Sequence, residues 1–402
     1  MIQDFYKNSN KINGVEVSVT SCGLKKTGKD DLVLIKFSRK GKIFGCFTNS
    51  KTPGESIKWN KSIINNGIVS AILINSGNAN VFNGIEGQKT QQNIITALSS
   101  ELNIDSKEIY IASTGVIGET LDEKKIINSL PKLIASLSND NDAWNKAANA
   151  IRTTDTFPKL SSRLINIEKS KIHISGIAKG SGMIEPNMAT MLAFIFTNAN
   201  FKNVSLKRKI QKLVDKTFNS ITVDGDKSTS DMMLFVSVND KKKCYVSIEK
   251  VNHFLENLKN VMQDLAIQIV KDGEGSKKLI QINVTKAKND SDAKILAKSI
   301  ANSPLFKTAM AGNDSNWGRI IMAIGKTNID INPRKICLKF GNIKILENGE
   351  KNKKLNQKKL KEYLCKPEIQ IFIDLGFGEG SSCVWTCDLT KEYISINADY
   401  RS

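Results

Sequence analysis

The sequence predicts a mixed α/β fold, and two stretches carry most of that prediction. Residues 191–196 are apolar throughout, as in a strand that is buried on both faces. Residues 251–270 repeat apolar side chains at three- and four-residue spacing, which is typical of a long amphipathic helix. Because strands and helices follow one another in no regular alternation, an α/β sandwich is favoured over a doubly wound sheet.

The remaining elements follow from apolar periodicity and from turn residues. We expect strands over residues 15–20, 32–37, 43–48, 69–74, 108–113, 171–178, 232–238, 279–284, 369–375, 383–387 and 393–396. We expect helices over residues 88–102, 139–151, 206–218, 292–300 and 320–324, and a lysine-rich loop and helix over 348–361. The segment Arg39-Lys40-Gly41 predicts a hairpin turn between two of the strands. No Pro- or Gly-rich linker separates independent domains.

Composition and charge limit the classes of protein to consider. The chain has 402 residues, of which 40% are hydrophobic, so it can bury a sizeable core. Its net charge of +19 comes from scattered lysines, with runs at 241–243 and 351–361, and no arginine-rich or aromatic-interleaved stripe is present. A solvated basic surface is therefore favoured over a nucleic-acid interface, which would predict steeply salt-dependent binding.

The cysteine and histidine content of the chain argues against several other classes of protein. The seven cysteines form neither a zinc pattern nor a disulfide framework, so we expect a reducing, cytoplasmic compartment and no metal. No apolar run of about 18 residues predicts a membrane span, and the N-terminus has no signal-peptide core. The two histidines, His173 and His253, have no carboxylate at triad spacing, which argues against a Ser-His-Asp mechanism.

The segment from Lys179 to Thr197 is the centre of the functional prediction. It begins as a glycine-rich loop and ends as the apolar strand, with Thr190 at the join. A hydroxyl at the mouth of a buried strand, beside free backbone N–H groups, is a plausible nucleophile. Spacing alone favours the structural interpretation, in which Thr190 is a β-branched residue in its preferred strand position.

Other loops supply polar groups at the ends of expected strands. Thr114-Gly115 follows the strand over 108–113, where a hydroxyl and an N–H could stabilise a developing oxyanion. The loop 153–156 is rich in Thr and contains one Asp, and Glu274 lies between two glycines on a sharp turn. The aspartates of 223–231 hint at calcium, but the closing Glu of an EF-hand loop is missing.

These segments together resemble the ornithine acetyltransferases, the bifunctional enzymes of arginine biosynthesis that also act as N-acetylglutamate synthases. The resemblance extends over nearly the whole chain, in a joint order that is highly specific. The segments that carry it are 21–25, 47–49, 75–80, 113–118, 153–156, 179–192, 223–226, 272–275, 316–319, 385–390 and 397–401.

The resemblance implies a self-cleaving, N-terminal-nucleophile-like α/β sandwich. Cleavage between Ala189 and Thr190 would give an α chain of residues 1–189 and a β chain of residues 190–402. Thr190 would be the nucleophile, with its own α-amine as general base, since such an amine has an ordinary pKa of about 7.7–8.0. Thr114 and Gly115 would form the oxyanion hole.

Substrate-binding positions are also implied by the resemblance. They are Thr154, Lys179, Thr190, Glu274, Asn397 and Ser402. A Lys and a Glu suit an amino-acid substrate that carries both charges. Family members commonly end in Thr, so Ser402 is a departure that keeps the hydroxyl.

The implied reaction is a ping-pong transfer of acetyl from N2-acetylornithine to glutamate, with ornithine as the first product. Acetyl-CoA is a possible alternative donor, and no bound cofactor is implied. The two chains would assemble as an α2β2 heterotetramer. A related self-processing aminopeptidase or amidohydrolase, which would hydrolyse the acyl-enzyme, remains the alternative, and a basic nucleic-acid-binding protein is a more distant one.

Overall fold

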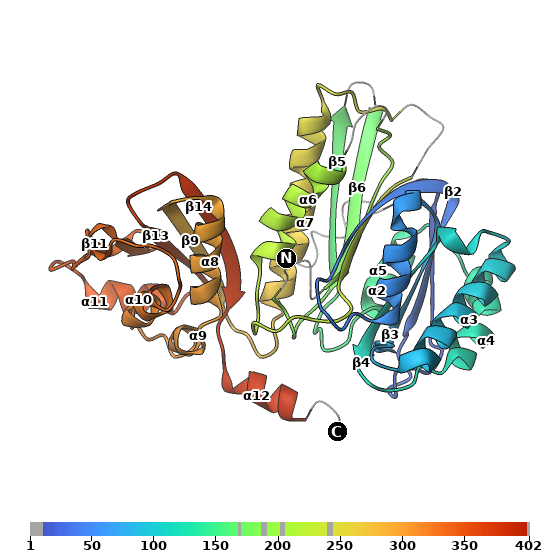
Figure 1. The fold of residues 1–402 in the computed structure, drawn as a ribbon, viewed down its shortest axis with the longest axis horizontal. Helices are drawn as coiled ribbons and strands as arrows, with labels where there is room; N and C mark the ends of the chain where they lie inside the picture. The colour runs from blue at the N-terminus through green and yellow to red at the C-terminus, as the bar shows by residue number, and fades with distance from the viewer. Residues whose placement is uncertain (1–10, 168–169, 186–190, 202–205, 239–243, 400–402) are drawn as a thin grey trace. The chain divides into compact units, whose positions relative to one another are not determined.

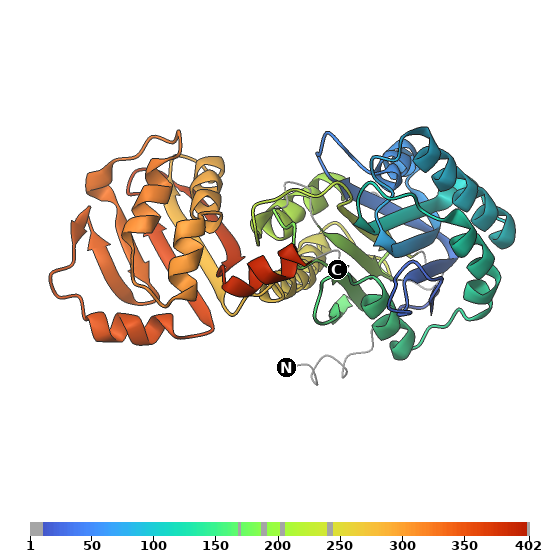
Figure 2. The same ribbon diagram turned by 90° about the horizontal axis from the view of Figure 1, so that it is seen from below.

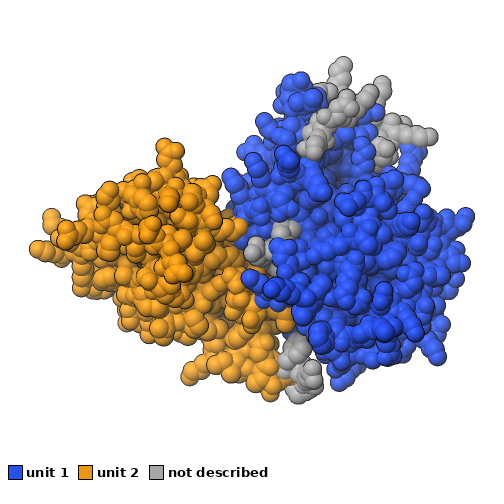
Figure 3. Space-filling view, viewed as in Figure 1, with its two compact units in different colours: residues 1–180, 186–219, 227–266 blue, residues 181–185, 220–226, 267–402 orange. Residues whose placement is uncertain are grey.

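The computed structural model describes residues 11–167, 170–185, 191–201, 206–238 and 244–399. The chain forms two compact units, which Figure 3 colours separately. Unit 1 comprises Met1–Gly180, Pro186–Asn219 and Lys227–Ala266, and unit 2 comprises Ser181–Glu185, Ser220–Asp226 and Ile267–Ser402. The short segment Ser181–Glu185 of the glycine-rich loop therefore belongs to unit 2, although Gly180 belongs to unit 1. The predicted division at 189/190 does not coincide with a unit boundary.

Unit 1 is built on a mixed sheet with strand order β4-β3-β2-β8-β7-β6-β5, and β1 pairs with β2. The β3–β4 and β7–β8 pairs are parallel, and the other neighbouring pairs are antiparallel. The strands are β1 Val15–Thr20, β2 Leu32–Phe47, β3 Ile68–Asn78, β4 Ile109–Val116, β5 Lys159–Ile167, β6 Ser170–Lys179, β7 Leu192–Thr197 and β8 Met232–Ser237.

Helices cover both faces of this sheet (Figure 1). One face packs against α5, whose Trp144 ring lies 5.2 Å from that of Phe196 on β7. On the other face, α3 and α4 pack over β2, β3 and β4, and α7 runs along β5 and β6. The helices are α2 Glu55–Ile63, α3 Gly84–Leu102, α4 Glu123–Ala135, α5 Asn141–Ala150, α6 Lys207–Lys216 and α7 Val251–Lys271, with 3₁₀ turns η1 Ile64–Asn66, η2 Ser106–Glu108 and η3 Phe218–Ser220.

Unit 2 has its own sheet, with strand order β12-β11-β10-β13-β9-β14. Its apolar core joins this sheet to α8, α9, α10 and α11, and Figure 2 shows helices of the unit against a face of the sheet. The strands are β9 Leu279–Ala287, β10 Cys337–Phe340, β11 Ile343–Glu347, β12 Glu350–Lys351, β13 Glu368–Asp374 and β14 Gly380–Cys387. The helices are α8 Asp290–Ala301, α9 Pro304–Ala311, α10 Gly318–Gly325, α11 Gln357–Leu364 and α12 Lys391–Ala398, and η4 is Pro333–Lys335.

The mixed α/β class is confirmed, but two expected elements are wrong. The predicted hairpin at 39–41 lies inside the continuous strand β2. The pairing register between β2 and β3 shifts between Lys36 and Gly41, so β2 has more residues than β3 over this interval. The second half of β2 leaves β3 and pairs with β8, which extends the strand instead of ending it.

The second error concerns residues 393–396, which the sequence predicts as a strand. They lie in the helix α12. Their alternating pattern is misleading, because the residues of this helix are not packed into an apolar core. Tyr393 and Asn397, four residues apart, lie on one helix face and make polar contacts within unit 2. None of the described helices is both long and apolar enough to cross a membrane.

Candidate active site

The predicted oxyanion residues lie where β4 ends beside β3. Gly115 pairs with Gly77 on β3, and its φ of +135° favours glycine. A Cβ atom at this position would lie 2.3 Å from the carbonyl carbon of Gly77, so no larger residue fits. The two strand ends are therefore in close backbone contact, and this contact fixes the position of the neighbouring Thr114.

Lys179, at the end of β6, lies next to Thr114. Its Nζ atom is 3.3 Å from the Thr114 hydroxyl oxygen and 2.8 Å from that of Thr153. The structure thus joins a predicted oxyanion residue with a predicted substrate-binding residue, although 65 positions separate them in the sequence. Thr154 is half-buried in the same loop as Thr153.

A buried aspartate that the sequence singled out only as part of a polar loop holds this arrangement together. One oxygen of Asp155 lies 2.8 Å from Nζ of Lys159, and the other lies 3.9 Å from Nζ of Lys179. The first oxygen also accepts a hydrogen bond of 2.6 Å from the N–H of Gly180. Burial alone would raise the pKa of Asp155, but the two lysines outweigh it and hold the pKa well below its usual range.

Lys159 is a buried neighbour of these residues that sequence reasoning missed. Its side chain is completely buried, with Nζ bonded to Asp155 and lying 4.8 Å from the centre of the Phe157 ring. A buried lysine needs a charged partner. The Asp155-x-x-x-Lys159 spacing in a loop rich in polar residues was the available signal.

In unit 2, the predicted residues Glu274 and Asn397 are in direct contact. The Asn397 side-chain amide donates a hydrogen bond of 2.8 Å to the Glu274 carboxylate, which is only 7% exposed. The backbone of Gly182 lies against the same carboxylate, since a Cβ there would come within 2.4 Å of it. The Glu274 N–H also donates to the carbonyl of Ser181. No lysine or arginine among the described residues forms an ion pair with Glu274.

Asp224 holds the segment that lies beside Glu274. Its carboxylate accepts hydrogen bonds from the N–H groups of Met183 and Ile184, at 2.6 and 2.8 Å, and one from the Tyr393 hydroxyl at 3.3 Å. Burial, with the charges of Asp224 and Glu274, raises the pKa of Tyr393. Asp224, one of the aspartates in the calcium-like sequence pattern, thus holds the glycine-rich loop in place.

Three predicted site residues, Ala189, Thr190 and Ser402, lie outside the described residues. The others divide between the units: Thr114, Gly115, Thr154 and Lys179 in unit 1, and Glu274 and Asn397 in unit 2. The described residues include no cluster of three or more His, Cys, Asp or Glu side chains suited to a metal ion.

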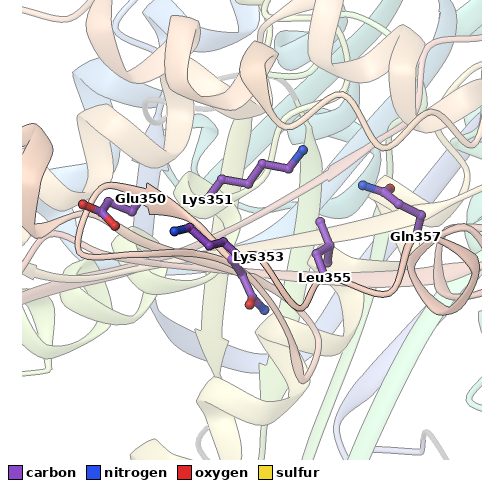
Figure 4. A pocket seen from close by; sticks show the side chains of 6 residues that line it. Glu350, Lys351, Lys353, Leu355 and Gln357 are labelled. Carbon is purple, nitrogen blue, oxygen red and sulfur yellow. The ribbon is translucent and has the colours of Figure 1, made fainter.

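One pocket in unit 2 lies on the β12 segment and contains none of the predicted residues (Figure 4). Most of its lining residues have polar side chains, and they are Glu350, Lys351, Asn352, Lys353, Leu355 and Gln357. It belongs to the lysine-rich surface that the sequence predicts to be solvated.

Comparison with known proteins decides the family. Residues 16–402 match the ArgJ family. The chain belongs to the ArgJ family. It is 41% identical over 394 residues to the arginine biosynthesis bifunctional protein ArgJ of Bartonella henselae, covering 97% of this chain and 96% of that protein. It is 39% identical to the ArgJ of Agrobacterium fabrum, over 99% of this chain and 97% of that one.

Two solved structures are also similar to this chain. A crystal structure of the Bacillus halodurans ArgJ is 38% identical, with a TM-score of 0.49, and covers 52% of this chain and 100% of that chain. A Mycobacterium tuberculosis ornithine acetyltransferase complexed with ornithine is 24% identical, with a TM-score of 0.42, and covers 44% of this chain and 94% of that chain. Membership of the ArgJ family confirms the predicted family resemblance and the prediction of an acyltransferase enzyme of arginine biosynthesis.

Proposed function

We propose that this member of the ArgJ family transfers acetyl from N2-acetylornithine to glutamate through an acetyl-threonine intermediate. The chain would first cleave itself between Ala189 and Thr190 by hydrolysis, in which one water molecule gives a carboxylate on Ala189 and a free α-amine on Thr190, and so chains of residues 1–189 and 190–402. The Thr190 hydroxyl then attacks the acetyl carbonyl, and its proton passes through the new α-amine to the departing nitrogen of ornithine. The amine of glutamate attacks the resulting ester, and N-acetylglutamate leaves as the threonine hydroxyl is restored.

The contact between Lys179 and Thr114 is the observation that carries this proposal. Each acyl-transfer step places negative charge on a carbonyl oxygen, and fixed donors lower the barrier where that charge develops. The Thr114 hydroxyl is a candidate donor at a rigid strand end, and the Lys179 ammonium lies 3.3 Å from its oxygen. A cation beside an oxyanion donor suits a reaction on a substrate that also carries a carboxylate.

Glu274 is the predicted substrate-binding carboxylate of unit 2. Its carboxylate has an amide partner in Asn397 but forms no ion pair with a lysine or arginine among the described residues. We propose that it binds an ammonium group of the amino-acid substrate, which would supply the missing cation. Acetyl-CoA is proposed only as a second acetyl donor, in keeping with the word bifunctional in the relatives' names.

The test is an assay of the purified protein with N2-acetylornithine and glutamate, in which mass spectrometry identifies the products. We expect N-acetylglutamate and ornithine in equal amounts. A parallel reaction with acetyl-CoA and glutamate tests the second donor. Release of acetate without N-acetylglutamate would contradict the proposal and favour the amidohydrolase alternative.

Variants of two lysines on β6 test whether Lys179 contributes to acetyl transfer. Lys179→Met should lower kcat/KM by about 10²-fold, because it removes a charged group from the predicted substrate site. Lys171→Met is the matched control, since Lys171 is exposed on the same strand β6. Equal activity of the two variants would exclude Lys179 from the site.

A further inference from the structure

Lys25 belongs to a loop, residues 21–25, that carries part of the family resemblance but has no role in the reaction described above. The loop is held by Asp31, which is buried. The Asp31 carboxylate accepts hydrogen bonds from the backbone N–H groups of Cys22, Leu24 and Lys25, at 2.7, 2.7 and 2.9 Å. These three bonds to one carboxylate fix the backbone from which the half-buried Lys25 side chain starts.

This loop lies against the strand ends of the predicted oxyanion site. A Cβ atom at Gly77, on β3, would come within 3.1 Å of the Leu24 carbonyl oxygen. Gly77 pairs in turn with Gly115 on β4. The backbone of Lys25 is therefore fixed one residue away from a contact with the strand pair that positions Thr114.

The Lys25 side chain connects to the same site through the carbonyl group of Ala150, the last residue of α5. Its Nζ atom donates a hydrogen bond of 2.8 Å to this oxygen, which also accepts one of 2.6 Å from the Ser76 hydroxyl. Ser76 lies opposite Thr114 in the parallel β3–β4 pair, in which neighbouring strands are about 4.8 Å apart. Contacts of both the backbone and the side chain thus place Lys25 beside the predicted oxyanion residue.

Lys25 and Lys179 contact opposite ends of one short segment. Lys25 bonds to Ala150, and Nζ of Lys179 lies 2.8 Å from the hydroxyl oxygen of Thr153, three residues later. Three residues of extended chain span at most about 11 Å. Unit 1 therefore has two ammonium groups close to Thr114, which suits a small molecule with two anionic groups.

The hydrogen bonds of the Lys25 ammonium go to uncharged groups. Nζ donates to the carbonyl oxygens of Asp30 and Ala150, at 2.9 and 2.8 Å. It forms no ion pair with a carboxylate in the part of the chain that the structure describes. Because an ammonium has three hydrogens, one is left for a further acceptor. A partly buried cation is best stabilised by an anionic acceptor.

The charges around Lys25 also favour an anion. Burial lowers the pKa of Lys25 to about 8, and the charges of Asp31 and Asp155 oppose this shift. The nearby cations Arg152 and Lys179 lower the pKa further. The group is still mostly protonated at about pH 7. A carboxylate bound at Lys25 would therefore relieve the repulsion among three cations.

The proposed reaction needs a cation of this kind. Its two amino-acid substrates share an α-carboxylate but differ in the charge of the side chain, which is an ammonium in N2-acetylornithine and a carboxylate in glutamate. Glu274, proposed above to bind an ammonium, would repel the glutamate side chain. The acyl acceptor therefore requires a different, cationic partner for its side chain.

We propose that Lys25 determines the specificity for the acyl acceptor: its ammonium binds the side-chain carboxylate of glutamate. The inference rests on the proposed function and deepens it. The third hydrogen of the ammonium makes the charge-assisted bond, while the Ala150 carbonyl keeps its bond from Ser76 if Lys25 turns towards the substrate. Lys25 takes part in no bond-making or bond-breaking step, so it acts on binding and not on the chemistry.

Lys25→Met tests this assignment on the full-length protein, since methionine keeps most of the length and removes the charge. KM for glutamate should rise about 10–100-fold, because a charge-assisted hydrogen bond is lost. In ping-pong kinetics, kcat/KM for each substrate reports its own half-reaction, and kcat/KM for N2-acetylornithine should stay within about threefold of wild type. An equal fall in kcat/KM for both substrates would indicate a structural defect and overturn the assignment.

Glutamine supplies a second measurement, because it has the shape of glutamate without the side-chain charge. In the wild-type protein, kcat/KM for glutamate should exceed that for glutamine at least about tenfold. Lys25→Met should lose most of this preference, and Lys25→Arg, which keeps the charge, should retain it. Lys26→Met is the matched control, since Lys26 is the exposed neighbour, and it should leave the kinetics with both acceptors unchanged.

The outcomes separate this proposal from the proposed function. If the wild-type protein makes N-acetylglutamate and Lys25→Met raises KM for glutamate no more than Lys26→Met does, the role of Lys25 is rejected and the proposed function stands. If Lys25→Met does not fold, equal use of glutamate and glutamine by the wild-type protein rejects that role. If the wild-type protein makes no N-acetylglutamate, the proposed function fails and this inference fails with it.

Discussion

Two buried carboxylates, Asp155 in unit 1 and Glu274 in unit 2, are surrounded in opposite ways. Asp155 faces the ammonium groups of Lys159 and Lys179, and it also accepts the N–H of Gly180. Glu274 accepts from the neutral amide of Asn397 and lies against the backbone of Gly182. The first carboxylate already has its cations within the chain, whereas the described residues give the second none.

This difference in partners predicts a structural role for Asp155 and a substrate-binding role for Glu274. A carboxylate that already pairs with two lysines holds those lysines in place. It has no need of a further cation from a ligand. A carboxylate that is buried without a cation is destabilised until one arrives. We therefore expect Asp155 variants to lose stability and Glu274 variants to lose substrate affinity.

The largest expected effect is on stability, from Asp155→Asn. Because this change leaves Lys159 buried without a counter-charge, the free energy of unfolding should fall by about 3–5 kcal/mol. Denaturant unfolding of the two proteins measures the difference. Asp142→Asn is the control, since its ion pair with Lys146 is on the surface, and it should change stability little.

The difference in free energy of unfolding between wild type and Asp155→Asn should depend on pH in a defined direction. The folded-state pKa of Asp155 lies below its unfolded value, so its contribution is fully present above the unfolded pKa of about 3.9. The contribution is lost as the pH falls through the folded-state value. The gap between wild type and Asp155→Asn should therefore be constant above about pH 5 and narrow below pH 4. A gap that widens on acidification would contradict the assigned pairing.

The next largest effect should be on reaction rates, from a substitution of Thr114 at the end of β4. Thr114→Val keeps the β-branched shape and removes the hydroxyl, so both self-cleavage and acetyl transfer should slow by about 10²–10³-fold. Time courses of chain cleavage and of N-acetylglutamate formation measure the two rates. Thr96→Ala, at an exposed position of α3, should leave both unchanged. A normal cleavage rate in Thr114→Val would remove Thr114 from the oxyanion role.

The smallest of the three effects should appear in substrate affinity. Glu274→Gln keeps the size of the side chain but removes its charge, so KM for N2-acetylornithine should rise about 10–100-fold with little loss of stability. Steady-state kinetics and thermal unfolding measure the two quantities. Glu392→Gln, on the exposed face of α12, is the control. A large loss of stability with an unchanged KM would make Glu274 a structural residue like Asp155, and the comparison would fail.

Much of this architecture could be predicted from local sequence pattern, because the spacing of apolar residues predicts buried strands and long amphipathic helices. The strand β7 and the helix α7 are examples. The continuation of β2 through Arg39-Lys40-Gly41 could not be predicted, since it depends on pairing with β8, almost 200 residues later. The helix α12 was missed because polar contacts to Asp224 and Glu274 stabilise it in place of an apolar face.

The candidate site shows the same division. Thr114, Lys179 and Glu274 were found through motifs that resemble a family, and the structure adds their partners. The buried position of Lys159 becomes visible only when the surrounding strands are assembled, because burial is a tertiary property. Neither spacing nor composition reports which polar groups lack a partner.

The most direct test of the proposed mechanism is the intact mass of the purified protein, combined with N-terminal sequencing. Self-cleavage at Ala189–Thr190 predicts two fragments of residues 1–189 and 190–402, with the second beginning Thr190-Met191-Leu192. Thr190 would then have the free amine that serves as general base. A single uncut chain of 402 residues with full acetyl-transfer activity would contradict the account, because Thr190 would have no such amine.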